Sequence, residues 1–173
     1  MVTEVQSFGP VIGRDPQVLI LGSMPGLASL DAAQYYAHPR NAFWPIMDQL
    51  FGIDASADYD IRIQQVSRQP VILWDTLRSC RRPGSLDSNI DIVSAQPNDF
   101  RGLMQRYHEI RAICFNGAAS EKYFRRLVAP ELELGAIKML RLPSTSPANA
   151  GMVYAEKLNA WRRLLDFIEP AKS

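Results

Sequence analysis

Four short apolar runs, separated by segments with helical spacing, constrain the fold of this chain more than any other feature of its sequence. The runs are Gln17–Gly22, Val71–Trp74, Ala112–Phe115 and Ile137–Leu142. Glycine, proline or asparagine stands at an end of each run, as is typical of strand boundaries. Short apolar runs of this kind are typical of strands in a sheet that is covered on both faces.

The segments between these runs have the spacing of amphipathic helices. Ala42–Phe51 places four apolar side chains on one face before it ends at Gly52. Further helices are expected at Ile61–Val66, from an Asn98 cap to about Tyr107 with Asp99 in its first turn, at Ala118–Val128 and at Val153–Ile168. Strands that alternate with helices predict a three-layer α/β/α sandwich around a mostly parallel, four-stranded sheet. The length predicts a single domain spanning residues 1–173.

The composition excludes several classes of protein. With 47% hydrophobic and 21% charged residues, the chain is neither disordered nor fibrous. No apolar run approaches the roughly 18 residues of a membrane span. The first residues lack the basic region and apolar run of a secretion signal. We therefore expect no membrane partner.

The cysteines and histidines, two of each, are scattered along the chain. Zinc and iron–sulfur clusters would lack the ligands they need, so we expect no metal and no cofactor. Cys80 and Cys114 do not make a disulfide framework, which fits a reducing compartment. A cytoplasmic location is predicted, associated with the nucleoid if the source is bacterial.

The formal net charge of +1 excludes a long polycationic coat for nucleic acid, but the basic residues are clustered. Arg78, Arg81 and Arg82 follow the second predicted strand and lead into a Pro-Gly-Ser turn. Ligands bind at such loops in open α/β sheets, so we expect phosphate contacts from Arg81 and Arg82. A solvated helix face is the expected setting of the two helical pairs, Arg125–Arg126 and Arg162–Arg163.

Three of the four loops after the predicted strands are rich in unusual residues. The first is Gly22–Gly26, which continues through Tyr35–Trp44; the second begins at Asp75, and the third is Pro143–Gly151. Glycine spacing in the first loop does not match a phosphate-binding loop, and no lysine followed by serine or threonine ends it. The three-glycine dinucleotide fingerprint is absent as well, so these glycines do not indicate a nucleotide cofactor.

Three stretches of these loops together resemble a known family. They are Gly22-Ser-Met-Pro-Gly26, Tyr35-Tyr-Ala-His-Pro-Arg-Asn-Ala-Phe-Trp44 and Leu142-Pro-Ser-Thr-Ser-Pro-Ala-Asn149. They resemble the motifs of the uracil-DNA glycosylase superfamily, and most of all its hypoxanthine-DNA (deoxyinosine) glycosylase branch. The resemblance implies a compact α/β/α sandwich that extrudes a nucleotide from the base stack and hydrolyses its N-glycosidic bond.

Asn41 is the residue to which the resemblance to the deoxyinosine branch assigns catalysis. Related glycosylases place a catalytic asparagine in the first loop, where this chain has Met24, and a methionine cannot orient a water molecule. The amide of Asn41 can accept a hydrogen bond from water and donate another that holds it in place. Asn41 also suits the cap of the helix that begins at Ala42, and the two roles can coexist.

Tyr36 falls where the superfamily stacks an aromatic ring on the flipped base. Stacking between a base and an aromatic ring contributes about 1–3 kcal/mol. Ordinary packing is the alternative role for Tyr36, and Tyr35 and Phe43 are the competing rings. His38 can donate to a phosphate or brace the loop, and it is assigned no catalytic role.

Asp75 ends the second strand, where the superfamily has residues that read the edge of the base. A carboxylate accepts hydrogen bonds only, so it favours a base with a ring N–H. Hypoxanthine offers N1–H and adenine has no hydrogen at N1, whereas uracil also carries a ring N–H. A helix cap and an ion pair with Arg78 are the alternative roles for Asp75.

Backbone groups of the first loop are expected to contact the base as well. The amides of Gly22, Ser23 and Met24 are expected to face a base carbonyl. At the third loop, Leu142 stands where many relatives have a histidine or an asparagine that donates to the departing base. This departure favours the deoxyinosine branch over a uracil-specific enzyme.

The third loop resembles the loop that grips the DNA backbone and fills the vacated place in the base stack. We expect its DNA contacts to come from Ser144, Thr145, Ser146 and Pro147, with Pro147 assisting Ser146 because serine is a small wedge. No lysine lies in the three loops, so we expect no Schiff base, and the product is an abasic site. The predicted partner is double-stranded DNA with a deaminated base, bound by a monomer.

Three other interpretations of the sequence stay open. The first is a mismatch-type uracil or thymine glycosylase of the same superfamily. The second is a relative that binds nucleotides or nucleic acids without catalysis, because both usual polar positions, Met24 and Leu142, are apolar here. The third is an unrelated small-molecule enzyme on a similar sheet, since a fold alone does not determine a function.

Overall fold

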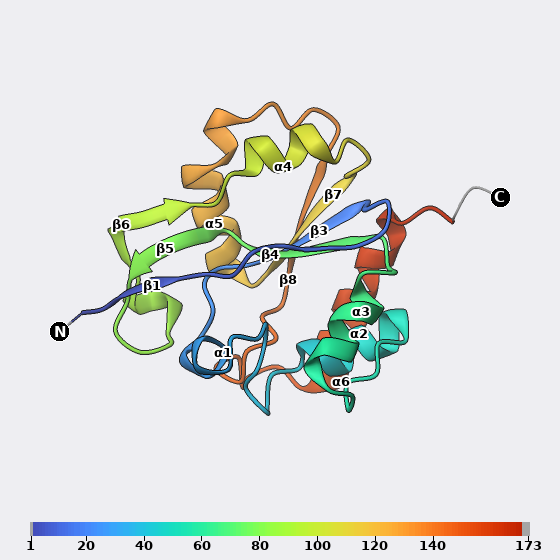
Figure 1. The fold of residues 1–173 in the computed structure, drawn as a ribbon, viewed down its shortest axis with the longest axis horizontal. Coiled ribbons are helices and arrows are strands. Elements are labelled where there is room, and N and C mark those ends of the chain that lie inside the picture. Colours follow the sequence, from blue (N-terminus) through green and yellow to red (C-terminus); the bar gives the residue numbers. More distant parts are fainter. Residues whose placement is uncertain (1, 171–173) are drawn as a thin grey trace.

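The computed structural model describes residues 2–170 and contains a central five-stranded sheet in the order β2-β4-β3-β7-β8 (Figure 1). Its strands are β2 (Val11–Ile12), β3 (Val18–Gly22), β4 (Val71–Asp75), β7 (Ala112–Asn116) and β8 (Lys138–Leu142). The last four are parallel, and they confirm the four predicted strands. The two-residue strand β2 adds an antiparallel edge to β4, so the sheet is mixed and one strand wider than predicted.

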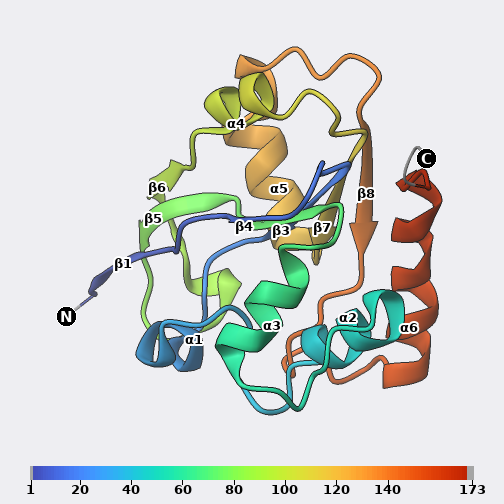
Figure 2. The same cartoon turned by 45° about the vertical axis from the view of Figure 1, so that its right-hand side comes forward.

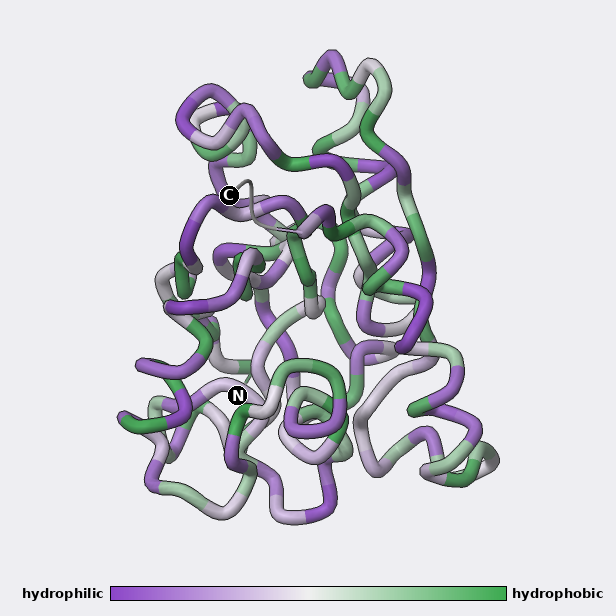
Figure 3. The backbone as a smooth tube through the Cα atoms, turned by 90° about the vertical axis from the view of Figure 1, so that its right-hand side faces the viewer, coloured by the Kyte–Doolittle hydropathy of each residue, from purple (hydrophilic) through white to green (hydrophobic). Residues whose placement is uncertain are grey.

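Helices cover both faces of this sheet (Figures 1 and 2). Val18 and Ile20 of β3 share one hydrophobic core with Trp161, whereas Leu19 and Leu21 share another with Phe124. One layer holds α2 (Phe43–Phe51), α3 (Tyr59–Val66) and α6 (Tyr154–Trp161), and the other holds α4 (Phe100–Arg106) and α5 (Ala118–Leu127). Hydrophobic and hydrophilic residues alternate at short intervals along these helices (Figure 3), as amphipathic covering layers require. The predicted three-layer sandwich is confirmed.

A second, antiparallel sheet was not predicted. It contains β1 (Glu4–Gln6), β5 (Leu77–Arg81) and β6 (Asp91–Pro97), in the order β1-β5-β6. One residue, Thr76, separates β5 from β4, and the sequence of β5 mixes polar with apolar residues. The prediction that the arginine cluster lies in a loop is therefore wrong, because Arg78 and Arg81 belong to a strand.

Shorter elements also differ from the prediction. Helix α1 (Leu27–Ala32), inside the first loop, is too short to show a helical period, and 3₁₀ turns occur at Asp87–Asn89, Ala129–Glu131 and Arg162–Phe167. The last of these turns replaces the final part of the long helix predicted to end at Ile168. Asp99 rather than Asn98 caps α4, because the N–H of Gly102 donates to Asp99 Oδ1 at 3.0 Å. No helix within residues 2–170 is long and apolar enough to span a membrane.

Candidate active site

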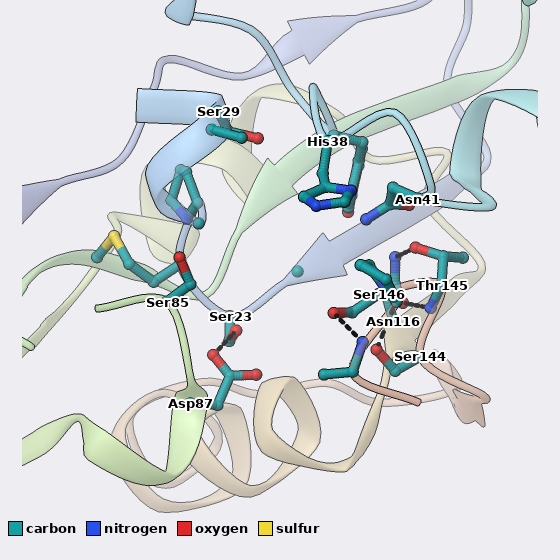
Figure 4. Close-up of a pocket in the computed structure, with 18 of the residues that line it drawn as sticks. Ser23, Ser29, His38, Asn41, Ser85, Asp87, Asn116, Ser144, Thr145 and Ser146 are labelled. Atoms are coloured by element: carbon teal, nitrogen blue, oxygen red, sulfur yellow. Dashed lines mark hydrogen bonds between the residues drawn. The ribbon is translucent and has the colours of Figure 1, made fainter. Parts of the chain in front are cut away.

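The carboxyl ends of the parallel strands open onto one hollow of about 560 Å³, which we call the sheet-edge cavity (Figure 4). Its walls are the loops after β3 and β8 and the last residues of β4 and β7, joined by residues 85–88 from beyond β5. Among the predicted site residues, those that line it are Gly22, Ser23, Met24, Tyr36, Asn41, Asp75, Ser144, Thr145, Ser146 and Pro147. The three predicted loops therefore meet at one place.

Asn41 is fixed at the start of α2. Its Oδ1 accepts a hydrogen bond from the N–H of Phe43 at 2.9 Å, although the N-cap of α2 is Ala42 and not Asn41 as predicted. Within a side-chain amide only the oxygen can accept from an N–H, and this bond therefore determines which amide atom faces the helix. The side-chain nitrogen is left to face the cavity and His38 (Figure 4). The amide thus presents a donor to the cavity, whereas the sequence analysis expected its oxygen to accept from water.

A reciprocal pair of hydrogen bonds ties the loop after β8 to the end of β7. Nδ2 of Asn116 donates to Thr145 Oγ1, and the N–H of Thr145 donates to Asn116 Oδ1, both at 2.9 Å. The carbonyl of Thr145 accepts from the N–H of Ala42 at 3.0 Å, directly beside Asn41. Thr145 is only 1% exposed, so the prediction that its side chain contacts DNA is wrong. Its role is to hold the loop, while Ser144, Ser146 and Pro147 stay partly exposed.

Tyr36 has a backbone conformation that is rare for a bulky residue, with φ at +54°. Its ring stacks on Phe43 at a centroid distance of 3.9 Å, so Phe43 supports the ring from behind. The competing ring of Tyr35 is buried, and its hydroxyl donates to the carbonyl of Gly9 at 2.7 Å. Strained backbone of this kind is concentrated at functional sites, and Tyr36 keeps a partly exposed ring in the cavity.

Asp75 lies at the floor of the cavity, at the end of β4, and is 3% exposed. Neither alternative role applies, because its side chain caps no helix and forms no ion pair with Arg78. Its Oδ2 has no hydrogen-bond partner among the described residues. Burial raises the pKa of Asp75 to about 7, and the nearby carboxylate of Asp87 adds to the increase, which Arg82 partly offsets. Buried, unpartnered carboxyls with a raised pKa are typical of functional sites.

Glycine is required beside this carboxyl. A Cβ on Gly22 would lie 2.5 Å from Asp75 Oδ1 and 3.2 Å from the hydroxyl oxygen of Tyr36. The first loop therefore approaches both side chains closely because it has no side chain of its own there. Met24 lines the cavity but is only 6% exposed and packs in a core cluster with Leu77, as expected for a residue that orients no water.

Asp87 and Asn116 are polar lining residues that were not predicted as members of the site. Asp87, in the 3₁₀ turn after β5, accepts a hydrogen bond from Ser23 Oγ at 2.6 Å (Figure 4), and burial raises its pKa. Asn116 is the last residue of β7. A polar residue at the end of a predicted strand is the sequence signal that could have identified it as a site residue. His38 also lines the cavity, and its Nδ1 accepts from the N–H of Arg40 at 3.1 Å, which braces the loop.

The two arginines predicted to contact DNA have different settings. Arg82 is 2% exposed, and its guanidinium donates to the carbonyls of Gly84 at 2.8 Å and Pro25 at 2.6 Å. The DNA contact predicted for Arg82 is therefore wrong, because this side chain joins the loops after β3 and β5 from inside the protein. Arg81 is exposed, forms an ion pair with Asp91 at 2.7 Å, and does not line the cavity.

A lysine from outside the three loops reaches one of them. Lys157 of α6 is buried, and its Nζ lies 3.5 Å from the carbonyl of Ser146. It does not line the cavity, so it supports the loop from behind. Within residues 2–170, no group of three or more His, Cys, Asp or Glu side chains is placed to hold a metal ion.

An aromatic ring, a buried carboxyl and a fixed amide thus line one cavity at the carboxyl edge of the sheet. A sequence model of the uracil DNA glycosylase superfamily matches residues 10–165. The chain belongs to the uracil DNA glycosylase superfamily, and it is a DNA glycosylase with DNA as its substrate.

Named relatives and a solved structure are similar over most of the chain. A hypoxanthine DNA glycosylase of Methanosarcina barkeri is 35% identical over 119 residues, which are 68% of this chain and 74% of the relative. Another, of Methanosarcina acetivorans, is 32% identical over 145 residues, covering 83% and 87%. A solution NMR structure of a candidate uracil DNA glycosylase from Methanosarcina acetivorans superimposes with a TM-score of 0.74 at 30% identity, covering 94% of this chain and 99% of that one.

Proposed function

We propose that this glycosylase removes hypoxanthine from deoxyinosine in double-stranded DNA and leaves an abasic site, as the first step of base excision repair. We also propose that it acts as a monomer in the cytoplasm. The observation that carries the substrate proposal is the position of Asn41, whose amide faces the cavity while Met24 of the first loop is buried in the core. The names of the two Methanosarcina relatives support the same substrate.

The reaction is a hydrolysis at C1′ of the extruded nucleotide. The bond from C1′ to the base nitrogen breaks with its electron pair leaving on the base, through a transition state with oxocarbenium character. Water then adds to C1′ and loses a proton, which balances the charge of the departing base. Asn41 holds this water by donating from Nδ2 to an oxygen lone pair. Tyr36, supported by Phe43, provides the stacking surface for the base.

Asp75 is proposed to distinguish hypoxanthine from adenine. Its ionised carboxylate accepts from N1–H of hypoxanthine, and the unpartnered Oδ2 gains the hydrogen bond that the protein itself does not supply. Adenine presents a lone pair at N1, which would leave two acceptors facing each other in a buried site. Because the pKa of Asp75 is about 7, the accepting form becomes dominant only above neutral pH.

Donors for the departing base are proposed to come from the first loop. Gly22, Ser23 and Met24 line the cavity, and backbone amides of such loops stabilise developing negative charge. Leu142 is buried and apolar, so it supplies no donor at that position. This chain therefore differs from uracil glycosylases that depend on a side-chain donor at the position of Leu142.

Three labelled duplexes test the proposal, carrying deoxyinosine, deoxyuridine or a G·T mismatch, with alkali used to reveal abasic sites. We expect cleavage of the deoxyinosine duplex and loss of that cleavage in Asn41→Ala. Asn159→Ala, an exposed asparagine on α6, is the matched control and should retain full activity. Preferential cleavage of the deoxyuridine or G·T duplex would replace the substrate proposal with the mismatch-type alternative. No cleavage of any duplex would indicate a binding protein.

A further inference from the structure

A second hollow, of about 590 Å³, adjoins the sheet-edge cavity. Asp87 and Ser88 line both hollows, so this short segment is their common wall. We call the second hollow the α5 groove, because its far wall is the exposed side of α5. That wall consists of Lys122, Tyr123 and Arg126, with Arg141 of β8 beside them.

The far wall of the α5 groove is positively charged. Lys122 and Arg126 are exposed and lie one helical turn apart on the same face of α5. Neither forms an ion pair in the part of the chain that the structure describes. Glu121 is the acidic neighbour on the helix, and it is already paired with Arg141 at 2.7 Å and with Arg125 at 3.8 Å. The carboxylate of the groove wall, Asp87, accepts from Ser23 at 2.6 Å, so Lys122 and Arg126 remain as two cations without an ion-pair partner among the described residues.

We propose that the α5 groove binds the phosphodiester backbone of the DNA strand that enters the sheet-edge cavity, with Lys122 and Arg126 on its phosphates. A nucleotide extruded into the cavity remains attached to its strand, so the neighbouring phosphates must pass over an adjacent surface. Cationic side chains without partners are the usual contacts of such phosphates. The groove shares a wall with the cavity and carries such cations, whereas the predicted contact Arg82 is buried.

This inference rests on the proposed function only in that DNA enters the cavity, and it is independent of which base is removed. The expectation that Arg125 and Arg126 form a plain solvated helix face therefore changes. Within that pair, Arg125 is engaged with Glu121 and Arg126 faces the groove. The phosphate contacts therefore combine a lysine and an arginine that are not adjacent in sequence.

Salt-dependent binding tests the proposal. Fluorescence anisotropy would measure the affinity of the whole protein for an undamaged duplex from 50 to 300 mM KCl. The double variant Lys122→Ala/Arg126→Ala should lower the slope of log affinity against log salt by about 2, because each phosphate contact contributes about 1. The matched control is Arg68→Ala/Lys138→Ala, which removes the same two charge types from exposed positions near the amino ends of β4 and β8. It should leave the slope unchanged.

A slope equal to that of the wild-type protein, with the fold intact by circular dichroism, would overturn the proposal. An equal fall of the salt slope in the control variant would also overturn the proposal, because the change would then reflect net charge alone. Charge-retaining Lys122→Arg should preserve the slope. The single-turnover excision rate at saturating enzyme should be unchanged in the control variant Arg68→Ala/Lys138→Ala, because these residues line neither hollow. If the wild-type protein does not excise hypoxanthine from deoxyinosine but the double variant still lowers the salt slope, the groove proposal is supported and the substrate proposal is contradicted.

Discussion

The two sides of the sheet-edge cavity differ in how their polar groups are satisfied. On the amide side, which consists of Asn41, Asn116 and Thr145, each side chain forms a hydrogen bond within the protein. The carboxyl side consists of Asp75 and Asp87, with the buried Arg82 near them but outside the cavity lining, and here some polar atoms have no hydrogen-bond partner. Asp75 Oδ2 and Arg82 Nη1 have no partner among residues 2–170.

The difference separates positioning from recognition. A satisfied network fixes its members in place, so the amide side is suited to hold a water and a loop in one geometry. Buried polar atoms without partners cost stability and persist where a ligand supplies the missing bond. The carboxyl side is therefore the side that we expect to contact the edge of the base, and five experiments can break or sharpen this division.

Asn41 should give the largest effect. Asn41→Ser retains an oxygen that can cap α2 but removes the amide nitrogen that faces the cavity. We expect single-turnover excision of hypoxanthine to fall about 10²–10³-fold, as for other positioning and charge-stabilising groups. The free energy of unfolding should change by less than about 1 kcal/mol. Full activity in this variant would remove Asn41 from the reaction, and a large loss of stability would show that capping is its main role.

Asn116 should give the next largest effect, because it acts through its neighbours. Asn116→Ala removes both hydrogen bonds to Thr145 and leaves the N–H of that buried residue without its acceptor. The expected cost in the free energy of unfolding is about 1–3 kcal/mol. Displacement of the loop beside Asn41 should also slow single-turnover excision by up to about 10²-fold. Urea unfolding and quench-flow assays on the same preparation measure both effects, and an unaltered excision rate would limit Asn116 to a structural role.

Asp75 should control the pH dependence of excision. Its pKa is about 7 in the folded protein, and the proposed contact uses the ionised form. Excision of hypoxanthine by the wild-type protein should therefore increase roughly ten-fold between pH 6 and pH 8, as expected for one titrating group. Asp75→Asn should flatten this profile and weaken the preference for deoxyinosine over deoxyadenosine duplexes. A profile that decreases with pH would instead assign Asp75 as a proton donor.

The same carboxyl should lower stability at high pH. The folded pKa of about 7 lies above the ordinary value of 3.8, so protonation favours the folded state. That contribution is complete below pH 3.8 and is lost as the pH rises through about 7. Asp75→Asn should therefore raise the free energy of unfolding at pH 8 relative to pH 5, by about 2.5 kcal/mol at most, because part of the contribution is already lost at pH 5. If Asp75→Asn changed the free energy of unfolding equally at pH 5 and at pH 8, the carboxyl of Asp75 would be solvated in the folded protein.

Leu86 should give the smallest effect, and only on duplex DNA. It is 53% exposed at the rim of the cavity, on the carboxyl side, where a leucine can fill the place vacated by the flipped base. Leu86→Ala should slow excision from a duplex several-fold and leave excision from single-stranded DNA nearly unchanged. Val93→Ala, another exposed apolar residue on β6, is the control. Equal slowing on both substrates would exclude this role.

The fold was predictable wherever a segment is uniformly apolar or strongly periodic. The four parallel strands and the helix Phe43–Phe51 follow from their own residues, because burial of both sheet faces requires such runs. Strand β5 was missed because Arg78 and Arg81 give it a polar sequence. Its place depends on pairing with β1, whose residues lie more than seventy positions away in the chain.

The site was predictable where the motifs name residues and unpredictable where distant loops meet. Asn41, Tyr36 and Asp75 do lie around one cavity. Arg82 and Thr145 were misassigned because each is buried by partners from other loops, the carbonyl of Pro25 and the amide of Asn116. Asp87 faces the cavity only because the turn after β5 folds back on Ser23. Such contacts depend on tertiary structure, which local sequence does not encode.

The most direct test of the account identifies the released base. A deoxyinosine duplex would be incubated with the wild-type protein or with Asn41→Ser, and the filtrate analysed for free bases by mass spectrometry. The account predicts free hypoxanthine from the wild-type reaction, in amounts equal to the abasic sites formed, and almost none from the variant. Equal release by both proteins, or release of uracil but not hypoxanthine from matched duplexes, would contradict it.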